Sequence, residues 1–180
     1  MTLDPNTAHP HLILSEDLTS VIYSNETQQL PDNPERFDYW VNVLGSEGFH
    51  SGTHCWDVEV GDKTYWTVGI MTEFAGRKGD IGQSRGRWFV NYNHGEYRAM
   101  STTFAWVFHS KAGSPIRVEQ KLQRIRVQLD CDRGKVFFYD PDNDTHLYTF
   151  KNTFTERVFP YFSTISPLRI LPVRASVKVE

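Results

Sequence analysis

The sequence has few cysteines, little net charge and no long apolar run, and each shortage excludes a class of protein. Its 180 residues contain two cysteines, Cys55 and Cys131, which predicts reduced thiols rather than a disulfide framework. The net charge of −3 disfavours binding to nucleic acid or to anionic membranes, because both require a basic surface. No apolar run approaches the roughly 20 residues that span a bilayer, and the N-terminus carries no signal-peptide pattern. We therefore expect a soluble, cytoplasmic protein that does not insert into membranes.

Motifs for catalysis, metal binding and cofactor binding are also missing. Ser51 directly precedes a glycine, but the spacing is not that of the Gly-x-Ser-x-Gly nucleophile elbow. His50, His54 and Cys55 lack the further ligand pair that a structural zinc site requires. An Asp-rich stretch carries Thr145 where a calcium loop needs glycine. We therefore expect a chain that is not an enzyme and holds no metal or cofactor.

What the sequence does contain is a large set of aromatic residues in alternating patterns. Twelve Phe, eight Tyr and five Trp favour strands over helices. Apolar residues alternate in 55–60 and again, after a Gly-Asp-Lys turn, in 66–70, which predicts a hairpin. Further strands are predicted at 88–93, 124–130, 135–139, 146–150, 159–162 and 168–173. Many short strands separated by turns predict an antiparallel sandwich, with at most a short helical turn at Asp4-Pro5.

Three tryptophans lie on the apolar faces of these predicted strands. Trp56, Trp66 and Trp88 each alternate with polar or small residues. We therefore predict that all three belong to the core and not to a binding surface.

Two longer stretches lack alternation. Residues 72–87 are rich in Gly, Arg and Lys, which predicts a mobile connection. Residues 100–115 contain Phe104, Trp106 and Phe108, which form either an extra buried strand or an exposed anchor for a partner. Polar residues on both sides favour the anchor, because aromatic residues are enriched among the energetically important residues of interfaces.

Several motifs, in order along the chain, resemble the PRY-SPRY family. Residues 3–10 (Leu-Asp-Pro-Asn-Thr-Ala-His-Pro) are similar to the start of its PRY segment, and Pro-Glu-Arg-Phe at 34–37 matches the segment that enters the next strand. His-Cys-Trp-Asp-Val-Glu-Val at 54–60 resembles the strand that opens the SPRY portion. Residues 129–134 are similar to its late turn, and Phe-Pro-Tyr-Phe at 159–162 to its closing strand. The chain looks most like the C-terminal domain of tripartite-motif (TRIM) E3 ubiquitin ligases, and similar tails occur in NOD-like receptors and butyrophilins.

This resemblance implies an all-β fold, a bent antiparallel β-sandwich. Residues 1–180 would form a single PRY-SPRY domain, with a PRY segment at about 1–50 and an SPRY portion at about 51–177. The parent chain would add a RING, a B-box and a coiled coil. Ligase activity, zinc and dimerisation would belong to those segments, and the isolated domain would be monomeric.

The resemblance also implies a ligand groove at one end of the sandwich. Matched to the family pattern, it comprises Thr67, Arg77, Lys78, Asn91, Asn93, Arg98, Phe104, Trp106, Phe108 and Ser163. Several relatives carry aromatic residues at the positions of Asn91 and Asn93, and the alternative for these two is a solvated strand face.

The function that this groove implies is recognition of a protein target, a substrate or a pathogen component, for ubiquitination in innate antiviral immunity. One alternative is the ligand-sensing tail of a NOD-like receptor. The other is butyrophilin-like binding of a small anionic metabolite, which would require a cationic pocket built from Arg77, Lys78 and Arg98.

Overall fold

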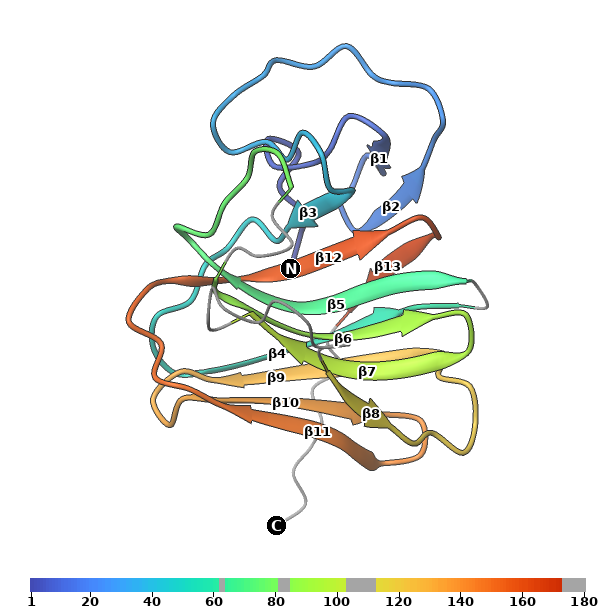
Figure 1. The fold of residues 1–180 in the computed structure, drawn as a ribbon, viewed down its shortest axis with the longest axis vertical. Helices are drawn as coiled ribbons and strands as arrows, with labels where there is room; N and C mark the ends of the chain where they lie inside the picture. Colours follow the sequence, from blue (N-terminus) through green and yellow to red (C-terminus); the bar gives the residue numbers. More distant parts are fainter. Residues whose placement is uncertain (62–63, 81–84, 103–112, 173–180) are drawn as a thin grey trace.

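The computed structural model describes residues 1–61, 64–80, 85–102 and 113–172, which form two stacked antiparallel sheets (Figure 1). The seven-stranded sheet has the order β1 (Leu12–Leu14), β2 (Ser20–Tyr23), β13 (Leu168–Leu171), β4 (Thr53–Glu59), β9 (Arg124–Asp130), β10 (Lys135–Asp140) and β11 (Thr145–Lys151). The six-stranded sheet has the order β3 (Asn42–Leu44), β12 (Val158–Thr164), β5 (Tyr65–Thr72), β6 (Arg87–Asn93), β7 (Glu96–Ser101) and β8 (Ser114–Ile116). In the part of the chain that is described, no helix is long and apolar enough to cross a membrane. The predicted all-β antiparallel sandwich is confirmed.

The core lies between the two sheets and follows the alternation of the sequence. In β9, Ile125, Val127 and Leu129 are fully buried, and the residues between them are not. The seven-stranded sheet contributes Trp56 to this core and the six-stranded sheet contributes Trp66 and Trp88, and each of the three is at most 4% exposed. The prediction that these tryptophans are core residues is therefore confirmed.

The predicted hairpin between residues 55–60 and 66–70 is wrong. Trp56 of β4 pairs with Val127 of β9, whereas Trp66 of β5 pairs with Tyr92 of β6, so the two strands belong to different sheets. Alternation identifies the buried face of a strand but not its neighbour, and both strands bury one face in the same core from opposite sides. By contrast, the β9–β10 and β10–β11 hairpins form as expected.

The first third of the chain is largely irregular, and a buried arginine holds it together. Between β2 and β3 the chain arches over the upper end of the sandwich (Figure 1). Arg36 is 5% exposed and donates hydrogen bonds to the carbonyl oxygens of Pro31 at 2.8 Å, Pro5 at 2.9 Å and Ala8 at 2.8 Å. Because these bonds compensate the burial of the charge, this segment packs as an integral part of the fold.

In the connection after β5, which the sequence predicts to be mobile, residues 73–80 make contacts with a distant part of the chain. Lys78 Nζ lies 2.7 Å from Asp32 Oδ1, and the Arg77 guanidinium lies 5.1 Å from the centre of the Phe37 ring. These contacts fasten the connection to a segment more than thirty residues earlier in the chain. A Gly- and charge-rich composition could not reveal this, because the partners are distant in sequence.

A histidine near the N-terminus predicts a pH-dependent stability. His9 Nδ1 accepts the backbone N–H of His11 at 3.0 Å, which requires that nitrogen to be unprotonated. Burial, and then the neighbouring His11, lower the pKa of His9, against the opposing effect of Asp38. Since the unfolded chain binds this proton more readily, stability is complete above the ordinary histidine pKa of about 6.5 and falls as the pH drops below it.

Urea denaturation at a series of pH values measures this effect. The asparagine of His9→Asn can still accept a hydrogen bond but does not titrate, so this variant should lose less stability than the wild type between pH 7 and roughly pH 5.5. Equal losses in the two proteins would show that His9 is not responsible.

Candidate ligand-binding face

The outer face of the six-stranded sheet carries a row of polar residues. Across five neighbouring strands, the register pairs Asn42 with Ser163, Ser163 with Thr67, Thr67 with Asn91, and Asn91 with Arg98. Directly paired residues of adjacent strands share a face, so these five side chains form one continuous polar row. The structure therefore brings together four of the residues that the sequence assigned to the groove.

The centre of the polar row is buried and internally bonded. Thr67 is 2% exposed, Asn91 9% and Ser163 3%. Asn91 Nδ2 donates to Thr67 Oγ1 at 2.8 Å and to the carbonyl oxygen of Trp66 at 3.3 Å. The alternative of a solvated strand face is therefore wrong for Asn91, whose amide is fixed in one orientation.

The open end of the polar row is at Arg98. The Arg98 side chain is 32% exposed and its Nη2 lies 3.3 Å from Glu96 Oε2, and Asn93, two residues beyond Asn91 on the same face, is exposed. Beside Arg98 is a hollow of about 320 Å³, whose walls include the apolar Pro115, the residue of β8 that pairs with Arg98. A partner can therefore reach a positive charge and an apolar hollow together at this end.

The other half of the same sheet face is covered. It belongs to a second apolar cluster made by Phe37, Leu44, Met71, Ala75, Phe89 and Tyr161. Next to this cluster, Arg87 Nη1 donates to the Tyr161 hydroxyl at 3.2 Å, and that hydroxyl donates to Asn42 Oδ1 at 3.2 Å. Burial raises the pKa of Tyr161, although Arg87 opposes the shift, so the hydroxyl stays protonated and can donate. The polar row is thus bounded on one side by a packed cluster.

The remaining predicted groove residues are not brought to the polar row. Among the described residues, Arg77 contacts Phe37 and Lys78 contacts Asp32, and neither contacts the polar row. Phe104, Trp106 and Phe108 lie outside the described residues.

Sequence reasoning also missed residues of this surface. Asn42 joins the polar row through β3, a strand that is three residues long and too short to give an alternation signal. Glu96 is the first residue of β7 and forms an ion pair with Arg98, and a charge next to a turn carries no distinguishing pattern. Outside the polar row, sequence reasoning also did not single out Phe74 and Tyr39, which are 77% and 61% exposed, because neither lies in a strand whose period could indicate its direction.

The fold and the polar row define the class of this protein as a β-sandwich binding module. A family model described as "SPRY-associated domain" matches residues 1–49, and one described as "SPRY domain" matches residues 53–170. The chain belongs to the SPRY family and carries the PRY segment in front of the SPRY portion. SPRY domains bind protein targets.

Curated relatives confirm the resemblance to TRIM-type proteins, and a solved structure shows the same fold. The chain is 45% identical over 166 residues to nuclear factor 7, ovary, of Xenopus laevis, covering 91% of this chain and 26% of that protein. It is 42% identical over 164 residues to the E3 ubiquitin-protein ligase TRIM69 of Mus musculus, covering 89% of this chain and 31% of that protein. The crystal structure of the TRIM65 PSpry domain has the same fold, with a TM-score of 0.79 at 23% identity, covering 96% of this chain and 89% of that one. The chain therefore spans between a quarter and a third of the length of these curated relatives.

Proposed function

We propose that this chain is the target-recognition domain of a TRIM-type E3 ubiquitin ligase and that it binds a protein at the open end of the polar row. The observation that carries the proposal is the alignment of Thr67, Asn91, Arg98 and Ser163 in one row that ends at an accessible arginine. Ligase activity, zinc and coiled-coil dimerisation belong to other segments of the parent protein. The domain itself is monomeric, acts in the cytoplasm and selects substrates or pathogen proteins in innate antiviral immunity.

The geometry of the polar row suits protein recognition. Because Asn91 is already hydrogen-bonded to Thr67, little side-chain entropy is lost when a partner binds. Arg98 offers a charge beside the apolar hollow, and arginines in such positions often contribute strongly to binding. The partner segment would present a carboxylate to Arg98 and an apolar side chain to Pro115.

A protein partner is favoured over a small anionic metabolite. A metabolite pocket would need clustered cations, and Arg77 and Lys78 are engaged by Phe37 and Asp32. A thermal-shift screen with anionic metabolites is expected to leave the melting temperature unchanged, whereas a bound ligand would raise it.

The variant Arg98→Glu tests the proposal. Reversing this charge should weaken binding of the protein target about tenfold or more, because it places like charges opposite each other. The measurement is affinity purification of the full-length protein from cells followed by quantitative mass spectrometry. The matched control is Arg133→Glu, which makes the same charge change at a side chain that is 79% exposed, in the turn that joins β9 and β10 of the other sheet.

We expect a set of proteins that wild type and Arg133→Glu retain and that Arg98→Glu loses. Both variants should melt within about 2 °C of the wild type, since exposed substitutions change stability little. If Arg98→Glu retains the same proteins in the same amounts, the open end of the polar row is not the binding site.

A further inference from the structure

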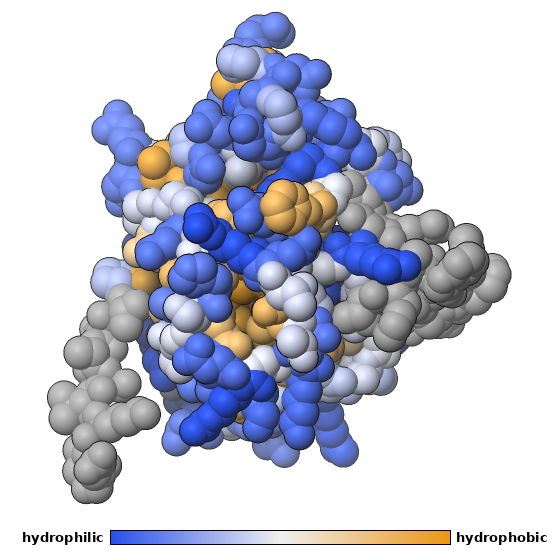
Figure 2. Space-filling model, turned by 90° about the vertical axis from the view of Figure 1, so that its left-hand side faces the viewer, coloured by the Kyte–Doolittle hydropathy of each residue, from blue (hydrophilic) through white to orange (hydrophobic). Residues whose placement is uncertain are grey.

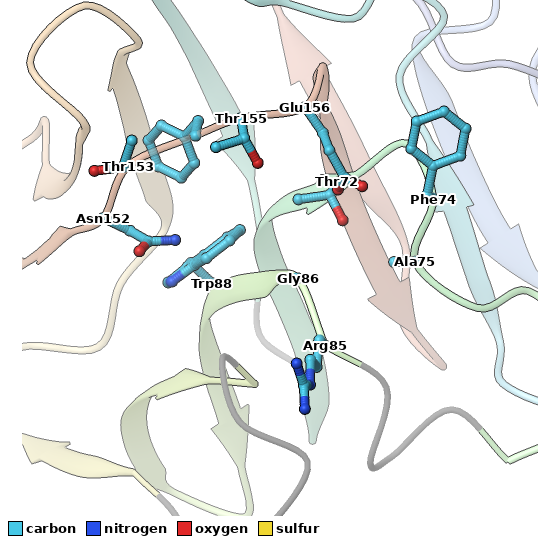
Figure 3. A pocket seen from close by; sticks show the side chains of 11 residues that line it. Thr72, Phe74, Ala75, Arg85, Gly86, Trp88, Asn152, Thr153, Thr155 and Glu156 are labelled. Atoms are coloured by element: carbon cyan, nitrogen blue, oxygen red, sulfur yellow. The ribbon is translucent and has the colours of Figure 1, made fainter.

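A second hollow, of about 520 Å³, lies at the end of the sandwich where β5 ends and β12 begins. Its walls are formed by Thr72, Phe74, Ala75, Arg85, Gly86, Asn152, Thr153, Thr155 and Glu156 (Figure 3). Trp88 and Phe154 supply its aromatic floor. These two rings meet edge to face with their centres 5.2 Å apart. On this side of the molecule, apolar surface shows between hydrophilic residues (Figure 2). The volume falls within the range of roughly 300–1,000 Å³ that is typical of ligand sites.

This hollow is separate from the polar row. Trp88 belongs to the inner face of the six-stranded sheet and packs in the core between the sheets. The hollow therefore opens at the edge between the two sheets, whereas the polar row lies on the outer face of one of them. An inference about the hollow stands independently of the function proposed above.

The polar side chains around the hollow are unpaired. Those of Thr72, Arg85, Asn152, Thr153, Thr155 and Glu156 surround it, and none of them makes a hydrogen bond or ion pair with another described residue. Polar groups that are unpaired around an aromatic floor are available to a ligand.

The backbone on one wall is also unpaired. Thr153–Glu156 connect β11 to β12, and within the described ranges none of these four residues makes a backbone hydrogen bond. A run of free N–H and C=O groups can pair with an extended chain, as exposed sheet edges do in peptide recognition. The occupant that this wall fits is therefore a peptide in extended conformation.

Two charges define what the peptide must carry. In the close-up, Glu156 lies above the level of Trp88 and Arg85 below it (Figure 3). A complementary segment has an acidic residue at the Arg85 side, a basic residue at the Glu156 side and an apolar side chain between them. Phe74, which is 77% exposed at the rim, adds apolar surface beside that side chain.

We propose that this hollow binds an extended peptide segment of a protein partner. The backbone of the segment pairs with Thr153–Glu156, and its apolar side chain packs against Phe154 and the exposed Phe74. Its acidic and basic residues pair with Arg85 and Glu156.

Selection from a library of random seven-residue peptides displayed on phage, against the 180-residue chain, tests the proposal. Enriched peptides are expected to carry an acidic and a basic residue on either side of an apolar one. Synthetic copies should bind Arg85→Glu about tenfold or more weakly than wild type, because like charges repel at the interface. They should bind the control Arg117→Glu unchanged, since this arginine is also exposed and lies beside the other hollow.

A charge exchange provides the second variant. Peptides with the acidic and basic residues exchanged should bind Arg85→Glu/Glu156→Lys better than they bind wild type, which also shows that the double variant is folded. In ¹⁵N spectra of the wild type, the amide signals of Thr153–Glu156 should shift when the original peptides are added.

Three results would overturn the proposal. One is a selection that enriches no peptide, and another is a set of peptides whose binding is lost in Arg98→Glu but kept in Arg85→Glu. The latter would assign the peptides to the polar row. The third is self-association of the chain, without peptide, that Arg85→Glu abolishes, which would assign the hollow to a second copy.

Discussion

Replacing Trp56 by alanine is expected to lower the free energy of unfolding by about 3–5 kcal/mol, as measured by urea denaturation. The side chain is 1% exposed and packs within the core cluster, with its ring centre 6.1 Å from that of Phe49. Removing the indole loses the free energy gained by transferring it from water to the core. It also leaves a cavity, which the neighbouring strands cannot fill because each is held in place by its own hydrogen bonds.

The control for this experiment is Trp56→Phe. Trp56 Nε1 is buried and has no hydrogen-bond partner, so a phenyl ring gives up no polar interaction. We expect this variant to cost only about 1–2 kcal/mol, most of it from the lost volume. Equal losses for Trp56→Ala and Trp56→Phe would contradict a cavity as the cause.

The second large effect is expected at Gly69→Ala. A Cβ at this position would lie 2.1 Å from the carbonyl oxygen of Trp88 and 2.6 Å from the Cα of Phe89. Both neighbours are backbone atoms of β6, the strand paired with β5, so they cannot move without breaking the ladder. We expect a loss of about 3 kcal/mol or more in the free energy of unfolding, at the upper end of overpacking effects.

Gly95→Ala separates crowding from backbone strain. Gly95 has a φ of +89° and nothing within 4 Å of the added Cβ, so this variant reports only the strain of a positive φ. Urea denaturation should give a loss of about 1–2 kcal/mol. A smaller loss for Gly69→Ala than for Gly95→Ala would mean that β5 and β6 can separate locally.

Gly69 also matters for the binding face, because it lies two residues after Thr67 on the same strand face. A displaced β5 would shift Thr67 relative to Asn91. Loss of a partner in Gly69→Ala or Trp56→Ala therefore says nothing about direct contact, whereas loss in Arg98→Glu does.

Local alternation was sufficient to predict the fold class but not the sheet order. The pattern in β9 marks its buried face without any knowledge of the rest of the chain. The neighbour of a strand depends on pairing between distant segments, which explains why the turn after Val60 was misinterpreted as a hairpin. The alternation in the sequence determines which face of a strand is buried, whereas tertiary contacts determine which strand lies next to it.

The candidate site was predictable only in part, for the same reason. The family resemblance named Thr67, Asn91, Arg98 and Ser163, and the register shows that they form one row. The burial of Asn91 could not be predicted, because an asparagine in a strand gives no sign of what packs over it. The hollow at Trp88 and Phe154 combines three segments far apart in the chain, and no local pattern contains it.

The strand order has a consequence for how this chain folds during its synthesis. The last two strands are internal to the sheets: β12 lies between β3 and β5, and β13 lies between β2 and β4. Neither sheet can close until the ribosome has released residues 158–171, so the earlier strands emerge with unpaired edges that can associate with other chains. We infer that this domain folds only once residues 158–171 have emerged, rather than strand by strand, and that its yield depends on protecting the unpaired edges of the earlier strands until then.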